Sequence, residues 1–81
     1  MDTKIAIIAI IVEDLSATEK MNEVLHEYSE FIIGRMGLPY RERNISIISI
    51  AMDATNETIN ALSGKLGNID GITAKAVFSK V

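Results

Sequence analysis

The apolar positions of this chain follow two different patterns. β-Branched and other apolar residues are dense in four runs: residues 4–13, 31–33, 45–52 and 72–79. Such side chains fit a pleated surface, so each run predicts a β-strand. Two other segments repeat apolar residues at the spacing of one helical face. They predict two helices with these apolar residues: Ala17, Met21, Val24, Leu25 and Tyr28 in the first, and Ile59, Leu62, Leu66 and Ile69 in the second.

Local signals mark the ends of both predicted helices. The segment Ser16-Ala17-Thr18-Glu19 has the form of a capping box, which predicts that the first helix starts there. Thr55 can cap the second helix through its hydroxyl. Gly67 can end that helix, because glycine tolerates the left-handed conformation found after many helix ends. Asp70-Gly71 then predicts a turn into the last strand.

The predicted elements occur in the order βαββαβ, which is the order of the ferredoxin-like plait. We therefore expect an α+β fold formed by one domain over residues 1–81. Its four-stranded antiparallel sheet would have the strand order 4-1-3-2, with both helices on one face. The positions of charged residues agree with this strand order, in which the second and fourth strands are the edges. Arg35 belongs to the second strand, and Lys75 and Lys80 belong to the fourth. Charged residues on edge strands discourage unwanted pairing.

The first strand is apolar on both of its faces. Two helices can cover only one face of the sheet, and a solvated face should alternate apolar and polar residues. We therefore expect a homo-oligomer, a dimer or a tetramer, packed through the open face of the sheet. Either side of the strand can supply the contact, which gives these candidate interface residues: Ile5, Ile7, Ile8 and Ile10. The alternative is that isoleucine is simply tolerated on a solvated face.

All three arginines lie within one short window. Three Arg against Glu42 give the segment 34–43 a charge of +2, whereas five Lys against ten acids give the rest of the chain −5. Arginine suits planar, bidentate capture of carboxylate or phosphate. We expect a connection between the second and third strands to bind an anion or a partner through Gly34, Arg35, Gly37, Tyr40, Arg41 and Arg43. The alternatives for the arginines are surface solubility and pairing between subunits.

Composition excludes several other classes of function. The net charge of −3 argues against direct DNA binding by the isolated chain. The longest apolar run, Ile5–Val12, is too short for the ~20 residues of a membrane helix. The absence of Cys fits a reducing cytoplasm, and the N-terminus lacks the pattern of a signal peptide. We expect a cytoplasmic protein with no membrane association.

The chemistry of the chain offers no catalytic or metal-binding constellation. His26 is the one histidine, and a closed metal site in one subunit needs several His or Cys ligands. A solvated helix residue is therefore the expected role of His26, and metal ligation or pH sensing is the alternative. One histidine also leaves no Ser-His-Asp set, and no phosphate-binding or dinucleotide motif occurs. We expect no metal, no cofactor and no enzymatic activity.

Four blocks of sequence carry a family resemblance: Leu25–Tyr28, Ile32–Arg43, Ile47–Ser49 and Ile59–Gly67. The string Gly-Arg-Met-Gly followed by Pro-Tyr-Arg is the most specific part. Together the blocks resemble the family of iron-only hydrogenase system regulators, short bacterial proteins of about this length. The resemblance implies a fold similar to ACT domains and to the C-terminal domain of the nickel-responsive repressor, which is the scaffold of a sensor.

The chain departs from those relatives at their ligand sites. ACT domains often have glycine in the loop after the first strand, whereas Glu13-Asp14-Leu15-Ser16 has none. The nickel repressor uses several His and a Cys. We expect no counterpart of its DNA-binding segment, because the first predicted strand starts almost at Met1. We expect a regulatory or sensor module that binds a small, anionic effector near a subunit interface and signals to a separate protein partner. The alternative is a structural or chaperone-like protein for hydrogenase assembly, with no small ligand.

Overall fold

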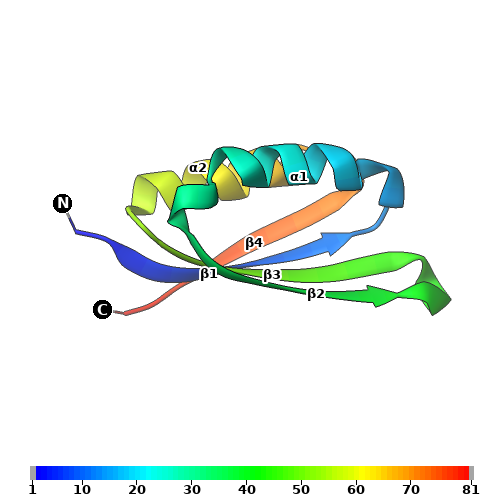
Figure 1. The fold of residues 1–81 in the computed structure, drawn as a ribbon, viewed down its shortest axis with the longest axis horizontal. Coiled ribbons are helices and arrows are strands. Elements are labelled where there is room, and N and C mark those ends of the chain that lie inside the picture. The colour runs from blue at the N-terminus through cyan, green and yellow to red at the C-terminus, as the bar shows by residue number, and fades with distance from the viewer. Residues whose placement is uncertain (1, 81) are drawn as a thin grey trace.

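One four-stranded sheet carries both helices on the same side (Figure 1). The computed structural model describes residues 2–80. The strands are β1 Lys4–Val12, β2 Ile32–Tyr40, β3 Ile45–Ala54 and β4 Ile72–Phe78, and the helices are α1 Thr18–Glu27 and α2 Asn56–Gly67. Every pairing is antiparallel, and the order β2-β3-β1-β4 is the predicted order counted from the other edge. The expected ferredoxin-like α+β fold is confirmed.

The core lies between the helices and one face of the sheet. Ile8 and Ile10 of β1 are fully buried there, next to Ile50 of β3. The helices contribute the predicted apolar positions, of which Met21 and Leu62 have no exposed surface. Each large side chain buried in this way stabilises the fold by about 1.5–3 kcal/mol relative to an exposed one. No polar or charged residue among residues 2–80 belongs to the buried class.

The first helix begins differently from the prediction. A 3₁₀ turn at Leu15–Ala17 precedes α1, and Asp14 caps that turn. The Asp14 Oδ1 atom accepts the backbone N–H of Ser16 at 3.0 Å and the Ser16 hydroxyl at 2.7 Å. The predicted capping box of Ser16 with Glu19 is wrong, because the carboxylate of Asp14 is a stronger, charged acceptor two residues earlier. These bonds, the hydroxyl first, hold the pKa of Asp14 below its ordinary value.

The second helix begins and ends at the predicted residues, but Gly67 does not adopt the left-handed conformation. The Thr55 hydroxyl accepts the backbone N–H of Thr58 at 3.2 Å and caps α2. Gly67 is the last residue of α2, but the chain continues in a right-handed conformation at Asn68. The left-handed glycine is Gly71, with φ of 87°, and a Cβ there would lie 2.5 Å from the Cβ of Asp14. Glycine is therefore required at Gly71 both by its backbone conformation and by space.

The second strand is much longer than predicted. We expected residues 34–43 to form a connection, but β2 runs to Tyr40 and stays paired with β3 up to Tyr40 opposite Ile45. A bulge separates Ile32 from Gly34. Pro39 is accommodated because β2 is an edge strand, where one N–H is not needed for pairing. The turn itself comprises only Arg41–Arg43 and Asn44, so the β2–β3 hairpin extends past the helices (Figure 1).

The helices are both short. Within residues 2–80, neither has the length and apolar character needed to cross a membrane.

Candidate functional site

The sheet has one face that no helix covers, which we call the open face. Partners in an antiparallel ladder point to the same side of the sheet. The register puts Ile7 beside Ala51 and Val77, and Ile11 beside Ile47. The large apolar side chains on the open face are 42–72% exposed: Ile5, Ile7, Ile11, Met36, Leu38, Tyr40, Ile47 and Val77. They form one apolar surface that crosses all four strands.

Of the interface residues expected from the sequence, the structure places Ile5 and Ile7 on the open face. Ile8 and Ile10 lie in the core, because α1 and α2 cover the other side of β1. Their inclusion among the interface residues was therefore wrong. The part of the open face that lies on β2 was not predicted, because Met36, Leu38 and Tyr40 were assigned to a connection.

Charged side chains are confined to the rim of the open face. Its central row carries the small residues Ala9 and Ser49, and this row ends at Met36 on one edge and Lys75 on the other. Asp53 lies near the end of β3 that is remote from the β2–β3 turn. A centre without charged residues inside a charged rim is the usual arrangement of a protein interface.

The three arginines do not form one cluster. Arg35 pairs with Ile50 in the ladder and so lies on the helix side of β2. Arg41 and Arg43 lie in the turn at the tip of the hairpin, six or more residues further along. Six residues of strand span about 20 Å. The turn is a single 3₁₀ turn rather than extended chain, so Arg41 and Arg43 do not share a side in the way expected for extended backbone.

The other predicted residues of the 34–43 window have structural surroundings of their own. The Tyr40 hydroxyl donates to Glu42 at 3.4 Å, and its ring belongs to the open face. Gly34 follows the bulge, as glycine in a strand often does. Gly37 lies within β2 opposite Ile48, so its assignment to a connection between strands was wrong. Neither glycine has positive φ.

A small cleft lies between α1 and the start of β2. Its volume is about 430 Å³, and these residues line it: Asn22, Leu25, His26, Ser29, Ile32 and Arg35. The Arg35 Nη2 atom donates to the Asn22 Oδ1 atom at 2.9 Å, so two of the lining residues are bonded to each other. This contact joins residues 13 positions apart in the sequence. Sequence patterns treated Arg35 and His26 separately, and only the packing of α1 against β2 brings them into one cleft.

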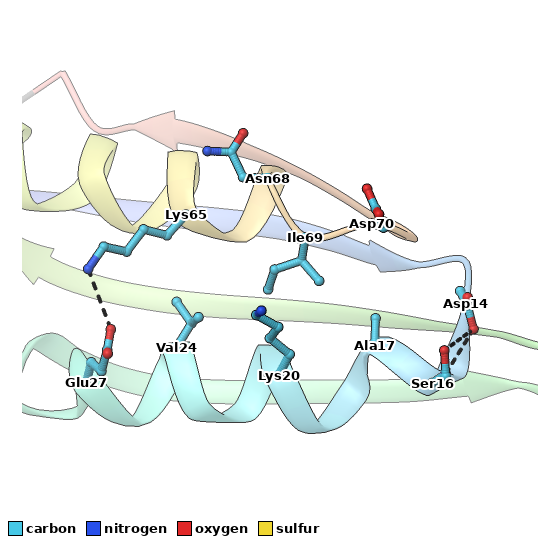
Figure 2. A pocket seen from close by; sticks show the side chains of 10 residues that line it. All are labelled: Asp14, Ser16, Ala17, Lys20, Val24, Glu27, Lys65, Asn68, Ile69 and Asp70. Carbon is cyan, nitrogen blue, oxygen red and sulfur yellow. Dashed lines mark hydrogen bonds and ion pairs between the residues drawn. The ribbon is translucent and has the colours of Figure 1, made fainter.

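A wider groove separates the two helices (Figure 2). Lysines and carboxylates both line it. Lys65 Nζ lies 3.5 Å from a Glu27 carboxylate oxygen and 5.2 Å from the centre of the Tyr28 ring. Tyr28 first, and then Glu27, raises the pKa of Lys65 above its ordinary value. The groove therefore contains a cation that its own walls already stabilise. Exposed pairs of this kind contribute little to stability.

Metal-ligating side chains are not grouped in the part of the chain that the structure describes. No three residues of the types His, Cys, Asp and Glu come together there in a way that could hold an ion. His26 lies instead in the α1–β2 cleft and in the neighbouring groove along α1, beside Asn22.

Comparisons with known proteins agree on one family. The sequence model of the TM1266-like family, described as "Iron-only hydrogenase system regulator, putative", matches residues 4–76. The solved structure of the uncharacterized protein TM1266 from Thermotoga maritima is similar to this chain with a TM-score of 0.92 and 42% identity, covering 98% of this chain and 100% of that one. A comparison with curated proteins finds no match. Because nearly the whole chain aligns, the long hairpin and the open face belong to the shared fold.

Proposed function

The chain belongs to the TM1266-like family, and we propose that it is a homo-oligomeric regulatory module of an iron-only hydrogenase system, assembled through the open face of its sheet. The family match supports the regulatory role. The exposed apolar surface of the sheet supports assembly and is the observation that carries this proposal. A small effector and a separate protein partner complete the proposed mechanism.

The size of the open face fits a specific interface. Strand spacing and rise give a four-stranded face of this length an outline of roughly 500 Å². Two such faces packed together would cover about 1,000 Å² in total, which is the lower limit for a specific interface. An apolar patch of this extent matches the largest patch on a typical monomer, and such patches are often functional.

A second copy of the chain is the occupant that the charges favour. Arg41 and Arg43 lie beyond one end of the open face, and Asp53 lies near the other end. A two-fold axis that packs two open faces with opposed strand directions brings the basic turn of one copy toward Asp53 of the other. Such an interface is self-complementary, as closed dimers require. A chain of 81 residues gains little stability by itself, and such an interface adds to that stability.

Sedimentation velocity tests the assembly with a matched pair of variants. Ile7 and Leu15 are 47% and 48% exposed, but only Ile7 lies on the open face. We expect the wild-type chain of 8.9 kDa to sediment as a dimer or larger species at micromolar concentration. Ile7→Glu should sediment as a folded monomer, and Leu15→Glu should keep the wild-type state. A wild-type chain that stays monomeric would overturn the proposed assembly.

The regulatory role needs a test in the cell that contains the hydrogenase. Deleting the gene should change hydrogenase transcript level or activity, and the wild-type gene should restore it. The Leu15→Glu gene should restore it equally, whereas the Ile7→Glu gene should not. Unchanged transcript and activity after deletion would contradict a regulatory role. A change in hydrogenase maturation alone, with no change in transcript, would favour the assembly-protein alternative.

A further inference from the structure

The cleft between α1 and β2 combines an apolar floor with hydrogen-bond donors on its walls. Leu25 is almost fully buried and forms the floor with the half-buried Ile32. Arg35, His26 and Ser29 line the same cleft. A pocket that pairs apolar surface with a few convergent polar groups is the usual form of a small-molecule site.

Arg35 is held in position by α1. Its place opposite Ile50 directs it to the helix side of the sheet, and the hydrogen bond to Asn22 Oδ1 fixes the end of the side chain against the helix. A side chain ordered before binding loses less conformational entropy when a ligand arrives. The bond to Asn22 occupies one of the five N–H donors of the guanidinium. Among residues 2–80, no carboxylate forms an ion pair with Arg35.

The electrostatic character of the cleft differs from that of its surroundings. No Asp or Glu is among its lining residues, although the chain contains 11 acids. The groove between the helices is lined by Asp14, Glu27 and Asp70, and the groove along α1 by Glu19 and Glu23. Of these three pockets, the cleft that contains Arg35 is the one with no carboxylate among its lining residues to compete for the guanidinium.

His26 and Ser29 extend the set of donors. His26 is one helical turn beyond Asn22, so both project from the same face of α1. The imidazole offers an N–H in either of its protonation states, and the Ser29 hydroxyl can rotate to donate. Together with the Arg35 fork, these groups can surround two oxygens of a planar or tetrahedral oxyanion.

We propose that the α1–β2 cleft binds a small organic anion, with its carboxylate or phosphate group on Arg35, His26 and Ser29 and a short apolar body on Leu25 and Ile32. The inference rests on the proposed function only in identifying this anion as the effector. The cleft lies on the helix side of β2 and the assembly surface on the other side. Ligand binding and assembly can therefore fail independently.

Amide chemical-shift titrations of the ¹⁵N-labelled protein test the site. Butyrate and inorganic phosphate are the anionic probes, and butylammonium is the control with the same apolar body as butyrate and the opposite charge. We expect saturable shifts centred on Asn22, His26, Ser29 and Arg35 with at least one anion and none with butylammonium. Saturation by butyrate alone identifies a carboxylate ligand, and saturation by phosphate alone identifies a phosphate ligand. Shifts with neither anion, or equal shifts with butylammonium, would overturn the proposal.

Two substitutions that each remove one positive charge separate a site from general attraction. Arg35→Gln should weaken binding of the successful anion at least about tenfold, because a charge-assisted hydrogen bond is lost. Lys20→Gln also removes one positive charge, but Lys20 lies on α1 and lines the groove between the two helices. This variant should leave the Kd of the anion unchanged. Equal weakening by both variants would show that net charge, rather than the cleft, attracts the anion.

The same samples distinguish this inference from the proposed assembly. Ile7→Glu should bind the anion as a monomer, because the cleft is complete within one chain. Anion binding by a wild-type protein that sediments as a monomer would reject the assembly and keep the site. An oligomer with no anion-dependent shifts would reject the site and keep the assembly.

Discussion

The two faces of the sheet carry similar side chains in very different surroundings. Ile7 and Ile8 are neighbours in β1, yet Ile7 is 47% exposed and Ile8 is 0% exposed. The helix-covered face buries its isoleucines within one chain, whereas the open face leaves Ile5, Ile11 and Ile47 in contact with solvent. The chain therefore completes only one of two apolar layers by itself. The second layer requires a cover from outside the chain, and we propose that a second copy supplies it.

The sharpest way to test this difference is to truncate the two neighbouring isoleucines. Ile8→Ala opens a cavity in the core and should lower the free energy of unfolding by about 2–5 kcal/mol. Ile7→Ala leaves no cavity within the chain. It should therefore lower the free energy of unfolding of the dissociated monomer by well under half of that amount. Urea unfolding at a concentration that keeps both variants monomeric measures the difference. Equal costs would mean that the open face already contributes to the packing of a single chain.

The helix-covered face also depends on the turn at Gly71, which joins α2 to β4. The Gly71 carbonyl accepts the backbone N–H of Glu13 at 2.7 Å and of Asp14 at 3.2 Å, which ties the end of β1 to the start of β4. In Gly71→Ala, the new Cβ would clash with the Asp14 side chain and the residue would keep a positive φ. We expect the variant to lose stability on the order of 1–3 kcal/mol, the strain typical of such a position.

Gly64→Ala is the control for that variant, because a Cβ on Gly64 meets no atom within 4 Å. Alanine in the interior of α2 should stabilise the chain by up to about 1 kcal/mol. Thermal unfolding should therefore move the two variants in opposite directions. A neutral Gly71→Ala variant would show that the turn does not hold the covered layer in place.

The charges at the rim of the open face should add a smaller, salt-dependent effect. If two copies pack with opposed strands, Arg41→Gln and Asp53→Asn should each weaken dimerisation by about 0.2–1 kcal/mol, the range for exposed ion pairs. Their effects should be less than additive, because either change removes the same contact. Sedimentation equilibrium at low and high salt measures this coupling. Fully additive, salt-independent effects would reject the proposed orientation of the two copies.

The smallest expected effect concerns pH and the capped turn before α1. The pKa of Asp14 is lower in the folded chain than its ordinary value, so its contribution to stability is present above about pH 4 and is lost as the pH falls through the lower folded pKa. Asp14→Asn should remove this part of the acid dependence while keeping a capping oxygen. Urea unfolding between neutral and acidic pH tests this. Acid dependence identical to that of the wild type would exclude a contribution from Asp14.

Much of the fold could be predicted because local and global signals agree in β1, β3 and α2. The apolar runs in both central strands and the Thr55 cap predicted the elements that form. The period of a strand shows that β1 has two apolar faces, but it does not say which face the helices cover. That choice depends on how the connections pack, and it separates Ile7 from Ile8.

The candidate site was harder to predict because it depends on pairing. Gly34, Gly37 and Pro39 weaken a strand when taken one at a time, yet the ladder with β3 keeps them in β2 up to Tyr40. This strand separates Arg35 from the other arginines. The contact of Arg35 with Asn22 joins distant parts of the sequence through tertiary packing alone, so no local pattern predicted it.

The most direct test of the central claim is an isotope-filtered NOE measurement on a mixture of isoleucine-methyl-labelled and unlabelled protein. We expect contacts between subunits from the methyl groups of Ile7, Ile11 and Ile47, which lie on the open face. We expect none from Ile8 or Ile50, which have no exposed surface. An oligomer whose intersubunit contacts exclude all three open-face isoleucines would contradict the claim that a second copy covers this face.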